Sequence, residues 1–404
     1  MRDVAIVGAG PAGAWAAYLL ARRGARVTIF DGSHPREKPC GGGVTGRALA
    51  LVADAVDQAA FPRTVIRSAR FCLTADAGVQ SRGLKPGFHA GVRLDPDALV
   101  VASRAALDAA LLAAAERVGA TLIRSRVADV AVDLSGVSLT TADGAHHRAS
   151  YVIGADGPNS LVRRRLATPF RRDQLSIATG FFAHGVTSDE IVIELTPDPP
   201  GYIWSFPRPG HLAIGICAQA DAGIGARALR QRTAAWIAAT RIAEGATLEP
   251  YSWPIPSLSA RDFDRLELAG PRWALVGDAA GLVDPITREG IFFALASAEW
   301  IARALADDDP APGYVSQVRD EAIAELSRAA RLKAGFFRPA FTGLLMRALT
   351  DSHAIRAVMA DLVAGRQPYA SLKWRLLKTF EFSLAWRALA SRAERRPAND
   401  YRPV

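Results

Sequence analysis

The chain has 404 residues, of which 50% are hydrophobic and 22% are charged. This composition supports two or three folded units with sizeable buried cores and excludes a chain that is disordered over most of its length. The three cysteines are too few and too scattered for a disulfide framework or a metal cluster, so we expect no metal site and a reducing, cytoplasmic setting. The net charge is +9, but no nucleic-acid-binding module is recognisable, and we expect no nucleic-acid partner.

The N-terminal segment has the pattern of a βαβ unit. Apolar residues predict a short buried strand over residues 4–7 and a second strand over residues 26–30. Between them, helical spacing runs over residues 11–23 and ends at Gly24, which suits a helix C-terminus. The strand, loop, helix and strand therefore follow one another in the order that a dinucleotide-binding unit requires.

The loop of this unit is rich in glycine and reads Gly8-Ala9-Gly10-Pro11-Ala12-Gly13. A pyrophosphate needs backbone N–H groups at close range, and glycine lets the chain turn tightly and approach it next to a helix N-terminus. We therefore predict that Gly8, Gly10, Ala12 and Gly13 contact a dinucleotide. Asp31, at the end of the second strand, can accept hydrogen bonds from the adenosine ribose. A tight turn without a ligand would also explain the glycines, but not the acid.

A second glycine motif lies far downstream and reads Gly277-Asp278-Ala279-Ala280-Gly281. It follows a strand predicted over residues 273–276, so Asp278 can bind a ribityl hydroxyl of a flavin. A helix predicted over residues 290–306 begins at Gly290 and Ile291, and its N–H groups can point at the flavin pyrimidine edge, where reduced flavin carries negative charge. A Gly-Asp pair is also a common turn. The two motifs together predict bound FAD.

The rest of the chain divides into segments with different patterns of apolar and polar residues. We predict an alanine-rich helix over residues 95–119, and further strands over 121–126, 130–134, 137–141 and 151–154. Alternating segments from residue 175 to about 253, and again in residues 62–93, predict a sheet-based substrate domain. Residues 313–392 are predominantly helical in pattern. The predicted limits are 1–61, 94–174 and 265–312 for the FAD-binding domain, 62–93 and 175–264 for the sheet-based domain, and 313–404 for a C-terminal helical region.

In its motifs the chain resembles the flavoprotein hydroxylase superfamily, which shares the para-hydroxybenzoate hydroxylase fold. The resemblance rests on the two glycine motifs and on Ala155-Asp156-Gly157-Pro158-Asn159-Ser160, and it spans about residues 1–310. It implies an α/β fold in which a Rossmann-like FAD-binding domain carries an inserted antiparallel-sheet substrate domain, followed by a C-terminal helical region. It also implies that Asp156 and Arg163 lie near FAD and a transient NAD(P)H, and that the backbone of Val127 meets the adenine. Arg104 matches an arginine that contacts FAD in relatives, although a solvated helix residue is an equal interpretation.

Two further segments resemble the geranylgeranyl reductase branch of this superfamily. They are the loop Lys38-Pro39-Cys40-Gly41-Gly42-Gly43 and the strand Tyr202-x-Trp204-x-Phe206-Pro207. The resemblance implies that Gly41 and Gly43 bring backbone close to the flavin and that Cys40 is a redox or acid group beside it. Tyr202 and Trp204 would line an apolar slot for an isoprenoid chain. The alternatives are a small buried residue for Cys40 and ordinary core packing for the aromatic side chains.

The function implied is that of an FAD-dependent oxidoreductase, resembling geranylgeranyl reductases, that reduces C=C bonds of a hydrophobic isoprenoid-type substrate. Hydride would come from flavin reduced by NAD(P)H. The alternative is an FAD-dependent monooxygenase that hydroxylates an aromatic or polyketide-type substrate, and a third interpretation is an electron-carrier subunit without a substrate of its own. No role is assigned to the seven histidines, and the sequence leaves the oligomeric state open.

The chain departs from its relatives at one position of the second motif. Relatives commonly carry Thr-Gly-Glu-Gly where this chain has Thr287-Arg288-Glu289-Gly290. Arginine adopts positive φ less readily than glycine. Arg288 therefore either takes an ordinary backbone conformation or adds a cation near the flavin or near an anionic substrate group.

The C-terminal residues 366–404 contain nine Lys/Arg and three Asp/Glu. Within them, residues 371–390 interleave basic side chains with aromatic and aliphatic ones, a pattern that is compatible with peripheral attachment to a membrane surface. Packing of this segment onto the flavin domain is the alternative. No apolar stretch reaches the roughly 18 residues that a spanning helix needs.

Overall fold

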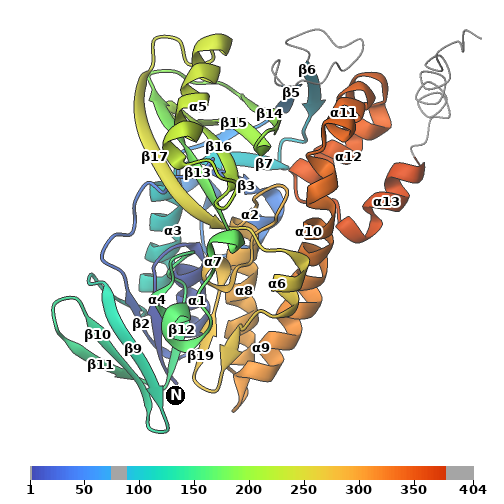
Figure 1. Ribbon diagram of the computed structural model, residues 1–404. Helices are drawn as coiled ribbons and strands as arrows, with labels where there is room; N and C mark the ends of the chain where they lie inside the picture. Colours follow the sequence, from blue (N-terminus) through green and yellow to red (C-terminus); the bar gives the residue numbers. More distant parts are fainter. Residues whose placement is uncertain (1, 74–88, 379–404) are drawn as a thin grey trace, which may run out of the picture.

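The computed structural model describes residues 2–73 and 89–378. Figure 1 shows an α/β part, a second large sheet beside it, and a group of helices from the end of the chain. This is the predicted fold class, a Rossmann-like domain of the para-hydroxybenzoate hydroxylase type with a C-terminal helical region. The part of the predicted basic segment beyond residue 378 lies outside the described residues.

The α/β part is built on a six-stranded sheet with the strand order β18-β19-β12-β1-β2-β8, parallel except at β18. The central strands are runs of buried apolar residues, as expected for a parallel sheet covered on both faces. The strands are β1 (Asp3–Val7), β2 (Arg26–Phe30), β8 (Thr121–Ile123), β12 (Tyr151–Gly154), β18 (Ala269–Gly270) and β19 (Trp273–Leu275).

Of three long helices of this part, α1 (Pro11–Arg22) packs against both α3 (Arg104–Arg117) and α8 (Ile291–Ala304). A small antiparallel sheet follows β8 in the chain and projects from the α/β part in Figure 1. Its strands are β9 (Val127–Asp133), β10 (Gly136–Thr141) and β11 (His146–Ala149). The shorter helices are α2 (Gly46–Val52), α4 (Leu161–Leu166), α6 (Ala260–Asp264), α7 (Gly277–Ala280) and α9 (Pro310–Val318).

The prediction of one helix over residues 95–119 is wrong in its first third. Residues Leu99–Ala102 form strand β7, which is fully buried and pairs with β3 (Gly43–Thr45) and β4 (Arg63–Val65). Two adjacent valines favour a strand, and Ser103 then caps α3 by accepting a hydrogen bond from the Ala106 N–H at 3.3 Å. The boundary between β7 and α3 was missed because the alanine-rich composition around it is typical of a helix.

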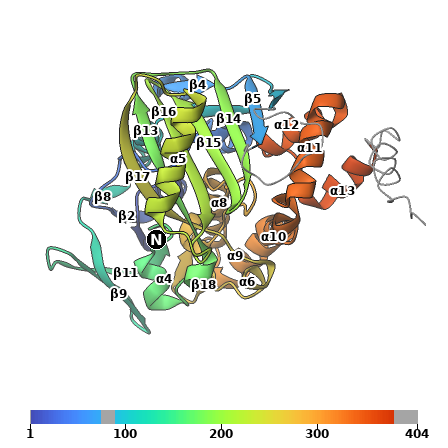
Figure 2. The ribbon, with the colours of Figure 1, turned by 45° about the horizontal axis from the view of Figure 1, so that its top comes forward.

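The second sheet has seven strands in the order β17-β13-β16-β15-β14-β5-β6. All neighbouring pairs are antiparallel except β14 and β5, which run parallel. The prediction of an antiparallel sheet is therefore wrong at this one pair. Helix α5 (Ala226–Thr240) lies across one face, as Figure 2 shows. The strands are β5 (Ser68–Leu73), β6 (His89–Arg93), β13 (Leu175–His184), β14 (Glu190–Pro197), β15 (Pro200–Arg208), β16 (His211–Gln219) and β17 (Thr247–Pro256).

The C-terminal helices are α10 (Ala324–Phe336), α11 (Pro339–Asp351), α12 (His353–Val363) and α13 (Tyr369–Lys378). Helix α11 contacts β5 and β6, helix α12 contacts β6, and an apolar core joins both helices to the second sheet. The sheet is therefore covered by α5 on one side and approached by the C-terminal helices on the other. In the described part of the chain, no helix is both long and apolar enough to cross a bilayer.

Candidate active site

A cavity of about 930 Å³ lies where the α/β part, the second sheet and the C-terminal helices meet. This volume is at the upper end of the range of about 300–1,000 Å³ that is usual for small-molecule sites. One part, the polar arm, is lined by the glycine loops and acids of the α/β part. The other part, the apolar arm, is lined by Phe71, Ile191, Ile193, Leu195, Ile286, Phe336, Met359, Leu362 and Val363.

The first glycine motif forms a cradle at the polar arm. Gly8 has φ +104°, and a Cβ there would lie 2.4 Å from the Ala155 carbonyl oxygen. Gly8, Gly10 and Ala12 line the cavity, and Gly10 is the N-cap of α1. Gly13 lies just behind them, where a Cβ would meet the Gly8 carbonyl oxygen at 1.9 Å. Gly13 thus lets the helix pack closely against the loop, so that backbone N–H groups face the cavity.

Asp31 lies at the end of β2 and lines the cavity. Its carboxylate accepts hydrogen bonds from the Ala9 N–H at 2.8 Å and the Ser33 N–H at 2.7 Å, and His34 Nδ1 lies 2.8 Å away. Burial acts to raise the pKa of Asp31, but the hydrogen bond and charge of His34 and the backbone N–H groups outweigh it and hold the pKa below its ordinary value. Asp31 is therefore an ionised acceptor.

His34 was missed by sequence reasoning, although it lines the cavity. Its Nε2 lies 3.5 Å from Asp108 Oδ2 on α3, while its Nδ1 contacts Asp31. The His34 ring thus links Asp31 to the buried Asp108. Its place three residues after Asp31 was the only local signal, because Asp108 is remote in sequence.

Arg104 is a buried residue at the start of α3, so its interpretation as a solvated helix residue is wrong. Its guanidinium pairs with Asp108 at 3.0 and 2.9 Å and lies 3.6 Å from Cys40 Sγ. Burial alone would lower its pKa, but the charges of Asp108 and Cys40 raise it. Arg104 and Val127 both line the cavity, where they were predicted to meet FAD.

The structure places Asp156 and Arg163 in different surroundings, because only Asp156 lines the cavity. Asp156 lines the cavity, and its Oδ2 accepts the Leu161 N–H at 2.6 Å, whereas its buried Oδ1 has no hydrogen-bond partner among the described residues. Burial raises the pKa of this carboxyl. Arg163 does not line the cavity, because it is turned toward the carbonyls of Ala279 and Thr168 at 2.7 and 3.0 Å. Arg163 ties α4 to α7 instead of reaching the cofactor site.

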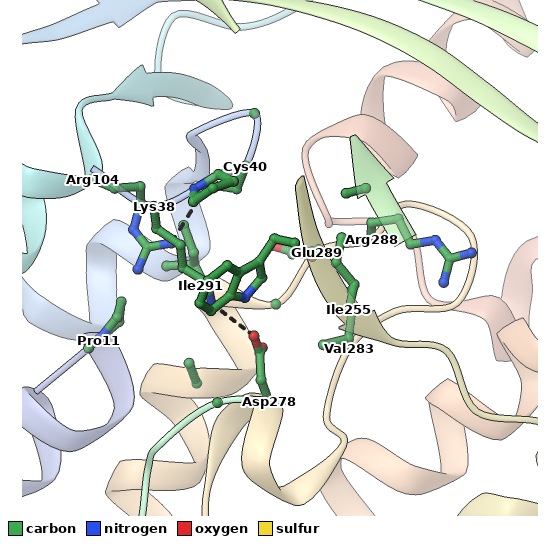
Figure 3. A pocket seen from close by; sticks show the side chains of 18 of the residues that line it. Pro11, Lys38, Cys40, Arg104, Ile255, Asp278, Val283, Arg288, Glu289 and Ile291 are labelled. Atoms are coloured by element: carbon green, nitrogen blue, oxygen red, sulfur yellow. Dashed lines mark hydrogen bonds and ion pairs between the residues drawn. The ribbon is translucent and has the colours of Figure 1, made fainter. Parts of the chain in front are cut away.

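The second glycine motif adjoins the first, because a Cβ on Gly277 would lie 3.2 Å from the Ala12 Cβ. Asp278 lines the cavity and forms an ion pair with Lys38 at 3.0 Å (Figure 3). Gly290 is the N-cap of α8 and Ile291 its first residue, and both line the cavity. The N-terminus of a long helix therefore faces the cavity and favours negative charge there. A flavin dinucleotide suits these features together, namely the N-terminus of α8, the glycine cradle, Asp31 and the unpaired oxygen of Asp156.

The two segments that indicated geranylgeranyl reductases touch each other. Gly41 and Gly43 line the cavity and pack under the ring of Phe206, where a Cβ would lie 2.7 and 3.1 Å from ring carbons. Gly42 has φ +83°, and a Cβ there would lie 2.6 Å from the Ala102 carbonyl oxygen. The glycines are thus required by the approach of β15 and β7 to this loop.

Arg208, directly after the second segment, fastens the contact. Its side chain is fully buried, and it pairs with Glu37 and donates to the carbonyls of Lys38, Cys40 and Gly41. Its Nη2 lies 3.5 Å from Cys40 Sγ, so the thiol sits between two guanidinium groups, those of Arg104 and Arg208.

Glu37 extends this network to α3, because it accepts hydrogen bonds from the Ser103 hydroxyl at 2.8 Å and the Arg104 N–H at 3.0 Å. The loop before β3, strand β15 and helix α3 are therefore joined by one ion pair, in which Arg208 is buried and Glu37 is half-buried. Sequence reasoning missed both Arg208 and Glu37.

Tyr202 and Trp204 project from β15 into the cavity wall. Their ring centroids are 5.9 Å apart, and Tyr202 stacks on Phe337 at 6.4 Å. The Tyr202 hydroxyl donates to the Thr287 carbonyl at 3.0 Å, and burial raises its pKa, so it stays protonated. Trp204 also packs in a small core with Phe182 and other residues. The two rings therefore belong both to the cavity wall and to the core.

Comparison with known proteins agrees with this geometry. The family of FAD binding domains matches residues 1–307. A menaquinone reductase of Mycobacterium tuberculosis is 31% identical over 393 residues, covering 89% of this chain and 91% of that protein. A geranylgeranyl diphosphate reductase of Synechocystis is 26% identical, covering 75% and 74%. The solved structure of a geranylgeranyl bacteriochlorophyll reductase-like protein from Thermoplasma acidophilum superimposes with a TM-score of 0.77 at 22% identity, covering 94% of this chain and 99% of that one.

The fold and the site thus define an FAD-dependent oxidoreductase. The match over residues 1–307 shows that the chain belongs to the family of FAD binding domain proteins, and the chain is similar to relatives named menaquinone reductase and geranylgeranyl diphosphate reductase.

Proposed function

We propose that this protein reduces C=C bonds in the isoprenoid chain of a hydrophobic substrate, using electrons that NAD(P)H delivers to FAD. The observation that supports this most is the continuity of the cavity, which joins the flavin-side loops to the apolar arm. Relatives named menaquinone reductase and geranylgeranyl diphosphate reductase act, by their names, on molecules that carry isoprenoid chains. The apolar arm offers such a chain aliphatic and aromatic walls of the kind that bind it by burial.

The residues around the joint of the two arms have separate tasks in this proposal. Bound FAD supplies hydride-transfer chemistry. Tyr202 and Trp204 hold the chain at the joint, and the enclosing walls exclude water, which matters because an isolated alkene is a weak electrophile. Cys40 delivers the proton to the second alkene carbon. Arg104 and Arg208, at 3.6 and 3.5 Å from its Sγ, stabilise the thiolate that remains.

The proposal is tested in cells by mass spectrometry of lipid extracts with and without the gene. We expect an isoprenoid that has gained two hydrogens per reduced bond when the gene is present, and accumulation of the unreduced form when it is absent. An unchanged isoprenoid profile, together with a product that has gained an oxygen atom, would contradict it.

Filling the apolar arm should shorten the chain that the enzyme accepts. Met359 on α12 is 6% exposed and lines this arm. Met359→Trp is expected to lower kcat/KM for a twenty-carbon prenyl substrate about ten-fold or more, because overpacking typically costs about 1–3 kcal/mol. A ten-carbon substrate should be affected much less. His353→Trp adds the same ring at an exposed position of α12 and is the matched control. Equal loss for both chain lengths would contradict the assignment of this arm.

We also propose that the protein attaches peripherally to membranes through its C-terminal helices. Five large apolar side chains on α10, α11 and α13 are exposed, namely Leu332, Phe341, Leu344, Trp374 and Leu377. Exposed basic residues, among them Arg338, Lys373 and Lys378, lie on the same group of helices. Apolar side chains that insert among headgroups and cations that meet anionic lipid are the two elements of such attachment.

The start of α13 does pack onto the rest of the protein, as the alternative interpretation has it. The Tyr369 hydroxyl donates to Asp284 at 2.8 Å, and the Tyr369 N–H donates to Glu325 at 2.6 Å. Further along the helix, Trp374 is 68% exposed and Leu377 is 42% exposed. The first turn thus anchors the helix, and its later turns face outward.

Replacing both Trp374 and Leu377 with serine is expected to reduce flotation with vesicles containing anionic lipid about ten-fold or more, because each buried side chain contributes about 1.5–3 kcal/mol. High salt should weaken flotation of the unaltered chain. Leu248→Ser, which removes an exposed leucine from β17, is the control and should float normally. Equal flotation of the double variant and the unaltered chain would contradict the proposal.

A further inference from the structure

The loop of residues 284–290, which we call the α8 entry loop, joins the second glycine motif to α8. Ile286, Thr287 and Glu289 line the cavity from this loop, and Gly290 at its end is the N-cap of the helix. The N-terminus of α8 favours negative charge in front of it. The shape of the α8 entry loop therefore decides where this favourable end meets the flavin side of the cavity.

Asp284 holds the α8 entry loop in a closed shape. Its Oδ1 accepts hydrogen bonds from the N–H groups of Ile286 and Thr287 at 2.7 and 2.9 Å. The Asp284 N–H donates to the Glu289 carbonyl at 3.0 Å, and the Asp284 carbonyl accepts the Arg288 N–H at 3.0 Å. One aspartate thus makes four hydrogen bonds within the loop, and two of them depend on where its carboxyl group lies.

The second oxygen of this carboxyl group is held by a residue from another part of the chain. The Tyr369 hydroxyl donates to Asp284 Oδ2 at 2.8 Å. Both side chains are buried, with 5% of Asp284 and 9% of Tyr369 exposed. Burial raises the pKa of Tyr369, so the hydroxyl stays protonated and serves as a donor. Burial also raises the pKa of Asp284, and its hydrogen bonds to the loop N–H groups and to Tyr369 act against this.

Tyr369 is itself fixed by the C-terminal helices. Its N–H donates to Glu325 on α10 at 2.6 Å, and its ring packs in the same apolar core as Met359 and Leu362 of the apolar arm. It also lies beyond residue 307, where the match to the family of FAD binding domains ends. The C-terminal helical region thus supplies a fixed donor to a loop of the FAD-binding part.

The other side of the α8 entry loop reaches the joint of the two arms. The Thr287 carbonyl accepts the Tyr202 hydroxyl at 3.0 Å, and the Thr287 N–H is one of the two that Asp284 binds. A continuous chain of hydrogen bonds therefore runs from Tyr369 on α13 through Asp284 and Thr287 to Tyr202. A satisfied buried network of this kind restricts the groups that it joins.

We propose that Tyr369 is a positioning residue for the flavin reaction and that it acts through Asp284. Its hydroxyl keeps the α8 entry loop in the shape that presents the N-terminus of α8 to the flavin and holds Tyr202 at the joint. The part that concerns Tyr202 rests on the proposed function, whereas the part that concerns bound flavin does not. Without the hydroxyl, one buried oxygen of Asp284 loses its donor. The carboxyl group then moves or takes up a proton, and either change weakens its hold on the loop.

Tyr369→Phe, which keeps the ring, tests the proposal in the FAD-loaded full chain. We expect the reduction potential of the flavin to shift to more negative values, because N–H groups that stabilise negative charge on reduced flavin move away from it. The flavin absorbance spectrum should change as well. With geranylgeranyl diphosphate as the probe, kcat should fall about five-fold or more and KM should change less than about two-fold, since the apolar arm keeps its walls.

Tyr314→Phe is the matched control. Tyr314 is also buried, and its hydroxyl donates to the Leu275 carbonyl at 2.5 Å. Its removal is expected to lower stability as Tyr369→Phe does, without changing the potential or the spectrum. A second comparison uses Asp284→Ala. If Tyr369 acts through Asp284, adding Tyr369→Phe to Asp284→Ala should leave the potential where Asp284→Ala alone has set it.

The potential and the spectrum decide the proposal even if no C=C reduction is found, so its failure is distinct from failure of the proposed function. An unchanged potential in Tyr369→Phe, or an equal change in Tyr314→Phe, overturns it. A shift to more positive values also overturns it, because the variant would then act by removing negative charge from Asp284 and not by moving the loop. A further shift in the double variant would show that Tyr369 acts by another route.

Discussion

Replacing Gly13 with alanine should leave a protein that no longer retains FAD. The added Cβ would lie 1.9 Å from the Gly8 carbonyl oxygen and 3.1 Å from the Ala155 Cβ, and neither the loop backbone nor β12 can yield without opening the cradle. We expect flavin absorbance after purification to fall to near zero. The free energy of unfolding should fall by several kcal/mol, because the first helix must shift away from the sheet.

Gly335→Ala is the matched control for this change. Gly335 lies in α10, and a Cβ there would meet nothing within 4 Å. Alanine is favoured over glycine by up to about 1 kcal/mol in a helix, and by less in the last turn where Gly335 lies, so the control should keep its flavin and at least its stability. A Gly13→Ala protein with a full complement of FAD would show that the close packing of α1 against the loop is not what shapes the cofactor site.

Replacing Arg208 with methionine should have the second large effect. Arg208 is fully buried, and its removal takes the charged partner from Glu37, which keeps only its neutral donors at the start of α3, and takes the side-chain donor from three loop carbonyls. Because the Glu37 side chain is 31% exposed, we expect the free energy of unfolding to fall by about 1–3 kcal/mol, the usual cost of leaving buried polar groups without a partner. Because the same loop carries Cys40 and Gly41, we expect a change in the absorbance spectrum of bound FAD and a loss of turnover larger than the loss of substrate affinity.

The control is Arg165→Met, which removes an exposed ion pair with Asp129 and should change stability by less than about 1 kcal/mol. Arg208→Lys separates charge from geometry, since lysine keeps the cation but cannot serve several carbonyls in a fixed fork. If Arg208→Met matched Arg165→Met in stability, spectrum and turnover, Arg208 would not be the link between the two segments.

The parts of the site that could be predicted from sequence are those with a local geometric cause. The glycines of the first motif and Asp31 follow from one βαβ unit, and Asp278 and Gly290 follow from one strand and the helix after it. Each depends on contacts within a few residues and on backbone freedom. The cavity lining at these positions is therefore readable without a structure.

What could not be predicted depends on partners that are remote in the chain. His34 contacts Asp108, and Arg208 pairs with Glu37, 171 residues away. Strand β7 was missed for the same reason, because β3 and β4 stabilise it from outside its own sequence. The orientation of Arg163 away from the cavity likewise depends on α7, which a motif taken from relatives does not show.

Arg288 lies between these two cases. The sequence identified it as a departure from glycine and offered an ordinary backbone or an added cation as explanations. The structure places it at positive φ, so the first explanation is wrong. Its pairing with Ser257 beside Lys333 was outside the reach of the sequence, because the three residues come from three separate elements.

The central claim, that reduced flavin in this protein passes hydride to an alkene, is tested most directly without oxygen. The FAD-loaded protein is reduced under anaerobic conditions and mixed with geranylgeranyl diphosphate or a menaquinone, and flavin absorbance and product mass are followed together. We predict that the flavin reoxidises in the absence of oxygen and that the product contains two more hydrogens for each flavin turned over. Flavin that stays reduced until oxygen is admitted, and then yields a product with one added oxygen atom, would contradict the account and identify a monooxygenase.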